Sequence, residues 1–266
     1  FTSSNCSGTA VTSLGATAYS ADITLYAKWT ANTYNITYVM NGGTNPSSNP
    51  TTFTYSESTQ TKTIANPTKV GYDFGGWTVT NGSISGNTLT INAGATSVTL
   101  TANWDAQKYA ITYRDQGNVA FSGTHASGYP TQHTYGTATT LKTASKTGYT
   151  FGGWFTSSNC SGTAVTSLGA TAYTSGITLY AKWTANSGTA YTVEHYQEKL
   201  DIANPSTSTA SHWNLVDTEN LSGTTGATVT PSVKSYTGFT APSTQTETIL
   251  ADGSLVVKYY YTRNIY

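Results

Sequence analysis

The sequence predicts a mainly β protein, built as a tandem array of small domains that forms an elongated rod. One long segment occurs twice almost unchanged, and apolar residues alternate with polar ones along several stretches. The composition also includes 20 Tyr and 25 Gly with one Met, and aromatic residues favour pleated strands. A chain of 266 residues allows two or three small domains.

The repeat appears at two spacings. Residues 1–30 and 155–184 differ only at positions 20–22 and 174–176. The motif Gly-Tyr-x-Phe-Gly-Gly-Trp at residues 71–77 returns 77 positions later, at 148–154. Solenoid units run about 20–45 residues, so this longer period predicts separate small domains.

We predict four pieces: the C-terminal half of a truncated repeat at 1–30, full repeats at 31–105 and 106–185, and a different unit at 188–263. The junctions between them are short and polar. Short links restrict the motion of neighbours, so we expect a semi-rigid rod. Because the chain opens inside a repeat, we expect it to belong to a longer protein.

Within each piece the apolar period is two, as in half-buried strands. Val98, Leu100 and Ala102 share one face, and the same pattern recurs at 177–183 and 255–261. The predicted core centres on indoles, which bury a large area each; the candidate core residues are Trp29, Trp77, Trp104, Trp154 and Trp183. Residues 165–172 could hold one short helical turn.

Charge and hydropathy exclude several functions. Twelve basic and twelve acidic residues leave no net charge, so electrostatic binding of nucleic acid has no driving force. No apolar run reaches the roughly 18 residues that a spanning helix needs, and we expect no membrane insertion by this segment.

Catalytic signatures are also missing from the sequence. It contains no Gly-x-Ser-x-Gly, His-Glu-x-x-His or calcium-loop motif, so we predict that the chain is not an enzyme and uses no cofactor.

Asp217 and Glu219 share a strand face, which we interpret as a surface pair. His125 and His133 could face each other as two metal ligands, although solvated loop histidines are the favoured interpretation; His195 falls in an inner-face register and is predicted to lie in a core.

The two cysteines, Cys6 and Cys160, occupy equivalent positions of the repeated segment. They could form intermolecular disulfides between neighbouring chains, or they could be half-buried loop thiols. Tyr196 and Tyr260 fall on outward registers, as do Tyr26 and Tyr180. Such rings either bind sugar rings or another chain, or pack across strands.

Three separated motifs carry a family resemblance. Tyr109-Ala-Ile-Thr-Tyr113, the Gly-Gly-Trp motif at 148–154 and Ile177-Thr-Leu-Tyr-Ala-Lys-Trp183 resemble the Listeria–Bacteroides repeat, also called the internalin B-type repeat. Residues 188–263 lack Gly-Gly-Trp, and their Tyr191-Thr-Val-Glu-His-Tyr196 and Ala251-Asp-Gly253 resemble the MucBP-like repeat. The resemblance implies β-grasp-like α+β domains with curved mixed sheets, in extracellular bacterial proteins that are attached to the cell surface or secreted. It implies no catalytic residues.

Three functions remain open from the sequence. The chain could be a structural stalk in a cell-surface adhesin, with near-identical copies acting as spacers. It could be a self-assembling extracellular fibre in which copies of the chain pair strand to strand. Residues 188–263 could instead bind host or extracellular glycans, mucin or proteins, a function that the resemblance alone suggests.

Overall fold

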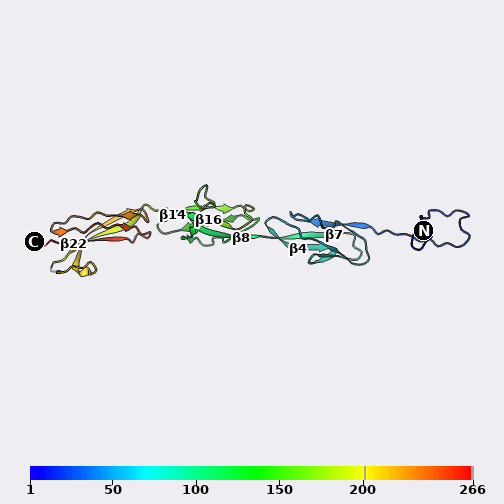
Figure 1. Cartoon of the computed structure of the whole chain (residues 1–266), viewed down its shortest axis with the longest axis horizontal. Coiled ribbons are helices and arrows are strands. Elements are labelled where there is room, and N and C mark those ends of the chain that lie inside the picture. Colours follow the sequence, from blue (N-terminus) through cyan, green and yellow to red (C-terminus); the bar gives the residue numbers. More distant parts are fainter. Residues whose placement is uncertain (201, 265–266) are drawn as a thin grey trace. The chain divides into compact units, whose positions relative to one another are not determined.

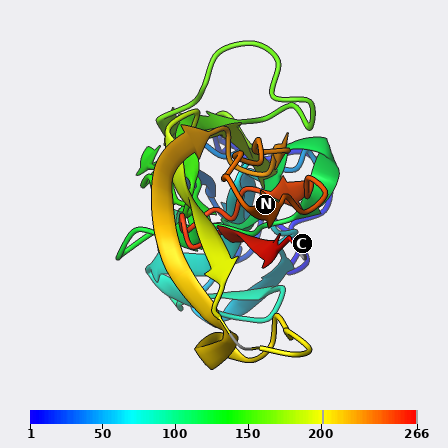
Figure 2. The same ribbon diagram turned by 90° about the vertical axis from the view of Figure 1, so that its left-hand side faces the viewer.

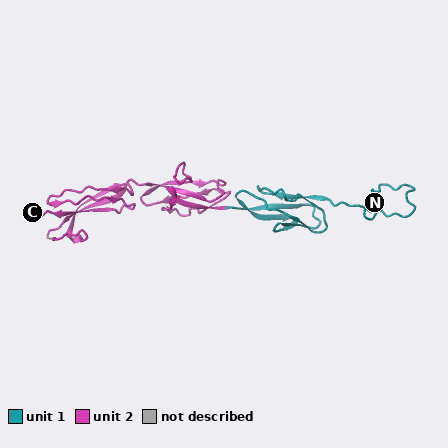
Figure 3. Ribbon diagram, viewed as in Figure 1, with its two compact units in different colours: residues 1–107 teal, residues 108–266 magenta. Residues whose placement is uncertain are grey.

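A computed structural model gives the fold and describes residues 1–200 and 202–264. The chain divides into two compact units, residues 1–107 and 108–266 (Figure 3). Strands dominate both units (Figure 1), which confirms the predicted mainly β array. In the described part of the chain, the helical elements are two 3-10 turns, η1 (Gln116–Asn118) and η2 (Ala210–His212).

The first unit contains one repeat, which we call the first repeat (residues 33–106). It has a four-stranded sheet in the order β2-β1-β7-β4 and a three-stranded sheet in the order β3-β6-β5. The strands are β1 (Thr33–Val39), β2 (Thr52–Thr54), β3 (Gln60–Thr63), β4 (Tyr72–Thr80), β5 (Gly82–Ser85), β6 (Thr88–Ile91) and β7 (Val98–Ala106).

The second unit contains the second repeat (residues 108–185) and the last module (residues 189–263). Their main sheets have the orders β11-β8-β16-β14, with β9 added to β8, and β18-β17-β22-β20. The second repeat has β8 (Lys108–Asp115), β9 (Val119–Ala120), β10 (Thr124–His125), β11 (Gln132–Thr134), β12 (Thr139–Thr140), β13 (Ala144–Ser145), β14 (Tyr149–Phe155), β15 (Ser167–Leu168) and β16 (Ile177–Ala185). The last module has β17 (Thr189–Glu198), β18 (Trp213–Gly223), β19 (Thr228–Val229), β20 (Phe239–Thr240), β21 (Glu247–Thr248) and β22 (Val256–Arg263).

In each main sheet the first and last long strands lie side by side and run parallel. The pairs are β1 with β7, β8 with β16, and β17 with β22. Every other pairing in these sheets is antiparallel, so the sheets are mixed. Because a parallel pair needs a long crossover, all the remaining strands of a module lie between its two central strands in sequence.

The alternating apolar residues of the last strands form the cores, as predicted. On β7, Val98, Leu100 and Ala102 are at most 1% exposed. The equivalent buried positions are Ile177, Leu179 and Ala181 on β16, and Val257, Tyr259 and Tyr261 on β22. Each main sheet therefore buries one face of its central strands in its own cluster of apolar side chains.

The Gly-Gly-Trp motif forms a β-bulge. The pairing of β14 with β16 shifts register between Phe151 and Trp154, and Gly153 has a φ of +110°, a conformation that favours glycine. Residues three apart on a regular strand face opposite sides, but the bulge brings the rings of Phe151 and Trp154 to 5.2 Å from each other. The equivalent residues Phe74, Gly76 and Trp77 of the first repeat have the same bulge and ring distance.

Four of the five predicted core tryptophans pack within the repeats. Trp154 is 2% exposed and donates its indole proton to the carbonyl of Lys142 at 2.7 Å. Trp77, Trp104 and Trp183 are partly buried; Trp104 donates to the carbonyl of Met40 at 2.9 Å and Trp183 to Asp115 Oδ1 at 2.7 Å. Trp104 and Trp183 thus tie the last strand of each repeat to the end of its first strand.

The prediction for Trp29 is wrong, because this side chain is 90% exposed. Its counterpart Trp183 packs against Phe121 and Phe151, which belong to the front half of a repeat, whereas residues 1–30 match the back half. No strand forms in residues 1–32, all of which are described. Phe1 and Tyr26 still exchange two backbone hydrogen bonds of 2.7 and 3.0 Å, at the positions where Phe155 pairs with Tyr180.

The predicted helical turn at residues 165–172 is also wrong. Val165 forms a bridge to Trp154, and β15 pairs with β12. Leu168 is fully buried in the core. The two glycines that flank this segment and its β-branched residues favour extended structure, and tertiary pairing decides the outcome.

The last module builds its core around His195, which is fully buried, as predicted. The Tyr261 hydroxyl accepts from the Lys234 backbone N–H at 2.8 Å and is hydrogen-bonded to His195 Nδ1, also at 2.8 Å. His195 Nε2 donates to Glu219 Oε1 at 2.7 Å, because a carboxylate oxygen accepts. Both imidazole nitrogens are satisfied, which makes the burial of this polar ring tolerable.

The two bulge glycines give a matched test of packing. We expect Gly76→Ala to destabilise the first repeat by about 1–3 kcal/mol, through backbone strain alone, because an added Cβ at Gly76 meets nothing within 4 Å. Gly153→Ala should cost the second repeat about 1–3 kcal/mol more, since its Cβ would lie 2.7 Å from that of Ala164. Urea unfolding of the full chain, followed by residue-resolved NMR, measures each repeat separately; equal costs would refute the role of Ala164.

Candidate functional site

The outward face of the main sheet in the last module carries a ladder of aromatic rings. Tyr196 on β17 and Tyr260 on β22 are direct partners across the parallel pair, and their rings stack at 5.2 Å with 20° between the planes. Trp213, at the start of β18, packs edge-on against Tyr260 at 4.8 Å. Trp213 is buried, while both tyrosines are partly exposed, so the tyrosines are the accessible part of the ladder.

An ion pair between Glu194 and Lys258 lies on the same outward face, two residues before the tyrosine on each strand. Lys258 Nζ is 3.4 Å from Glu194 Oε2 and 5.6 Å from the Tyr196 ring centroid, and the Tyr196 hydroxyl donates to Glu194 at 2.7 Å. Hydrogen bonding to Glu194 raises the pKa of Tyr196 and that of Lys258. The outward face therefore carries the protonated Tyr196 hydroxyl and the charged Lys258 ammonium, and both contact the Glu194 carboxylate.

An open hollow of about 440 Å³ adjoins Tyr260. Its lining combines one aromatic ring with polar groups: Tyr260, Lys258, Val256, Gln245, Thr207 and Ser208. Gln245 Nε2 donates to the Lys258 carbonyl at 2.8 Å, which fixes the amide in place. A ring platform beside hydroxyl, amide and ammonium groups has the chemistry to stack on a flat apolar surface and to hydrogen-bond the rim of a polyhydroxylated ligand.

The connection from β17 to β18 lies against this face. Trp213 Nε1 donates to the Ser206 carbonyl at 2.9 Å, which holds part of the connection over the start of β18. Beyond that point β18 curves strongly alongside β17 (Figure 2). Its pairing with β17 shifts register between His195 and Tyr196, where Val216 is the extra residue, and such a bulge increases local twist.

The histidine predictions fail for both residues. His133, which was favoured as a solvated loop residue, is fully buried and bonds Thr139 through Nδ1 at 2.8 Å. His125 lies between the rings of Tyr129 and Phe121 at 3.9 and 4.3 Å, and burial lowers its pKa. The two are on strands with different partners, so the structure does not bring them together as metal ligands.

The interpretation of Asp217 and Glu219 as a simple surface pair was incomplete. Both side chains are about one third to two fifths exposed. Lys234 binds both carboxylates, lying 3.4 Å from Glu219 and closer to Asp217, and these contacts lower the pKa of Asp217 and raise that of Lys234. Glu219 also accepts a hydrogen bond from His195 Nε2, so Asp217 and Glu219 border one side of the core.

The sequence reasoning missed this network because Lys234 is remote from β18 in the chain. The available signal was the alternation of carboxylates on β18, which places Glu219 opposite a buried residue, Val193. An acidic residue on an inward register predicts a cationic or proton-donating partner.

Both cysteines lie in the same local turn. The Asn5 and Asn159 side chains each accept from the backbone N–H two residues later, at 3.0 Å, and Cys6 and Cys160 have φ values of +55° and +53°. Both are free thiols. Cys160 is 5% exposed, and burial raises its pKa, so a disulfide to another chain would require this turn to open.

The described residues contain neither a cluster of three metal ligands nor a membrane-spanning helix. No group of three or more His, Cys, Asp or Glu side chains is placed to hold a metal ion. Over the same residues, no helix has the length and apolar character that are needed to cross a membrane.

Comparison with known proteins shows a relative and a family. A protein of Evansella cellulosilytica named "Putative membrane protein" is 33% identical over 175 residues, which cover 63% of this chain and 25% of that protein. The chain thus spans about a quarter of the length of this relative. The resemblance of residues 188–263 to MucBP-like repeats stays a prediction.

The family model described as the Listeria-Bacteroides repeat domain matches residues 34–103 and 109–182. These ranges contain the main sheets of the first and second repeats, with their parallel central strands and Gly-Gly-Trp bulges. The chain belongs to the Listeria-Bacteroides repeat family.

Proposed function

We propose that this chain is a non-catalytic spacer in the stalk of a bacterial cell-surface adhesin. The observation that carries the proposal is the parallel pairing of the first and last strands in every module. When the first and last strands of a module are parallel neighbours, the chain enters the sheet at one end of these strands and leaves it at the opposite end. Each module therefore advances the chain along its strand direction, as a spacer requires.

The advance can be estimated from the register. β8 begins three residues before Ile111, and β16 continues eight residues past Ile177, the parallel partner of Ile111. Eleven residues at about 3.3 Å each carry the chain about 35 Å. The first repeat has the same offsets, with Ile36 paired to Val98.

An extracellular location at the bacterial surface is part of this proposal. The name of the Evansella relative describes a membrane protein, and the chain spans only about a quarter of it. That supports a role as one stretch of a longer, surface-associated protein. Low charge and repetition of nearly identical segments also suit a segment whose length matters more than its surface.

Changing the number of repeats tests the spacer function. Deletion of residues 33–107 joins Asn32 to Lys108, which begins the second repeat where Thr33 begins the first. We expect the maximum dimension in solution, from small-angle X-ray scattering, to fall by about 35 Å, because one module advances the chain by about eleven residues.

The matched control inserts an extra copy of residues 108–185, which should lengthen the molecule by a similar amount. Changes well below 35 Å in both variants would contradict a spacer in which each repeat contributes its full strand length.

A second candidate function is glycan binding by the last module, and the Tyr196–Tyr260 ladder favours it. The Tyr260 ring lines an open hollow together with Lys258, Gln245 and two hydroxyl side chains. A sugar ring offers an apolar face for stacking and a rim of hydroxyl groups. Cross-strand packing alone would explain the stacked pair, but not the polar groups beside its accessible side.

A glycan array probed with the full chain tests this second function. If a glycan binds, Tyr260→Ala should weaken binding about tenfold, equivalent to about 1.4 kcal/mol, because the platform is lost. Tyr26→Ala, which removes another exposed tyrosine, should have no effect. The absence of binding above background, or equal losses from both substitutions, would count against the site.

A further inference from the structure

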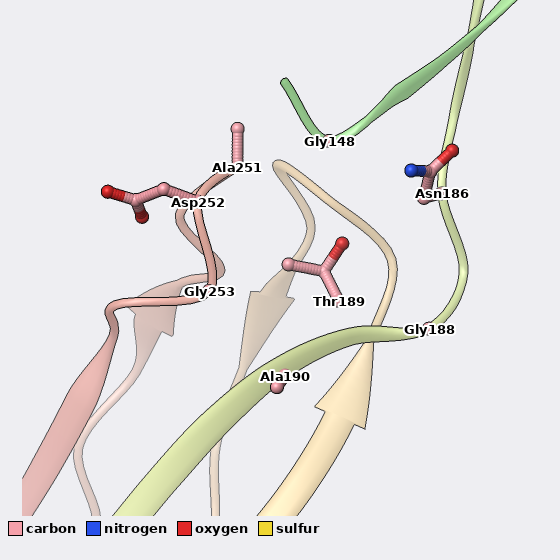
Figure 4. A pocket seen from close by; sticks show the side chains of 8 residues that line it. All are labelled: Gly148, Asn186, Gly188, Thr189, Ala190, Ala251, Asp252 and Gly253. Carbon is pink, nitrogen blue, oxygen red and sulfur yellow. The ribbon is translucent and has the colours of Figure 1, made fainter.

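A seam joins the second repeat to the last module within the second unit. On the repeat side it is formed by the turn at Gly148, before β14, and by Asn186, which follows β16. On the other side are two turns of the last module, around Thr225 and around Ala251. Gly148, Asn186 and the turn around Ala251 line an open hollow of about 460 Å³, and Figure 4 shows Gly148 and Asn186 facing the Ala251–Gly253 turn across it.

Asn186 makes three hydrogen bonds at this seam. Its backbone N–H donates to the Gly148 carbonyl at 2.9 Å, and its own carbonyl accepts from the Thr225 N–H at 2.9 Å. Its side-chain Oδ1 accepts from the Thr150 hydroxyl at 2.8 Å. One residue of the linker is thus bound both to the repeat before it and to the module after it.

The remaining linker is short. β16 ends at Ala185 and β17 begins at Thr189, so only Ser187 and Gly188 lie between Asn186 and the next strand. Thr189 is buried and bonds the Thr225 hydroxyl at 2.6 Å. The first residue of the last module is therefore held in place by that module's own turn. Only two linker residues are left over which the chain could bend.

Gly148 brings the two backbones into contact. A Cβ built on it would lie 2.8 Å from the Ala251 carbonyl oxygen and 2.9 Å from the Ala251 Cα. These are backbone atoms, so no side chain could move aside to make room. Gly148 also has a φ of +74°, but that conformation by itself would tolerate Asn, as it does at Asn41 and Asn81.

We propose that the turn at Gly148 is a docking surface for the Ala251 turn of the following module, and that with Asn186 it locks the second repeat and the last module into one rigid body. The partner that this surface fits is a tight backbone turn, because only a surface without a side chain lets another backbone approach so closely. The lock depends on these contacts alone and holds whether or not the chain acts as a spacer.

Distance measurements across the seam test the lock. Spin labels are placed on Thr112→Cys in β8 and Thr218→Cys in β18, both exposed positions, in the full chain with Cys6→Ser and Cys160→Ser. We expect double electron–electron resonance to give a single narrow distance distribution. Gly148→Ala should broaden it at least twofold, because the added Cβ pushes the Ala251 turn away.

Two further variants separate the clash from backbone strain. Gly148→Asn keeps the Cβ but tolerates the positive φ, so it should also broaden the distribution, and it serves if Gly148→Ala fails to fold. Gly128→Ala places the same strain at a φ of +72° with nothing within 4 Å, and its distribution should stay narrow. A broad distribution in the parent, or a narrow one in Gly148→Asn, would overturn the proposal.

Discussion

The parallel pairing of the first and last strands is the constraint on which each module depends. These two strands are central in every main sheet, and the other strands of the sheet attach to their outer edges. The pairing closes a loop of more than 50 residues, which costs chain entropy. It is stabilised by the alternating apolar residues of the last strand, which are almost completely buried.

The repeats and the last module stabilise this pairing by different means. In the repeats, a glycine bulge turns Phe151 and Trp154, or Phe74 and Trp77, to the same side of the sheet, so a short motif supplies two packed rings. The last module has no such bulge motif. It uses the buried rings of Tyr259 and Tyr261 on β22 and a histidine that is hydrogen-bonded at both nitrogens.

Much of the fold followed from the sequence, because period-two alternation and the 77-residue spacing are local or self-repeating signals. The buried faces of β7, β16 and β22 were predicted residue by residue. The failures concern contacts between distant residues. His133 is buried because β11 adds to β8, and Glu219 is held by Lys234 from another segment. Trp29 is exposed because the rings that cover its counterpart come from another half-repeat. The aromatic ladder was predicted as single tyrosines, but its stacking needed the register of β17 against β22.

Hydrogen exchange of the full chain, followed by NMR, tests the central role of the parallel pair most directly. If β8 and β16 stabilise each other, amides in both strands should exchange only through the same slowest opening of the second repeat. The short strands β12 and β15 should exchange faster. Fast exchange throughout β8 while β16 stays protected would show that the module holds together without its first strand, and would contradict the account.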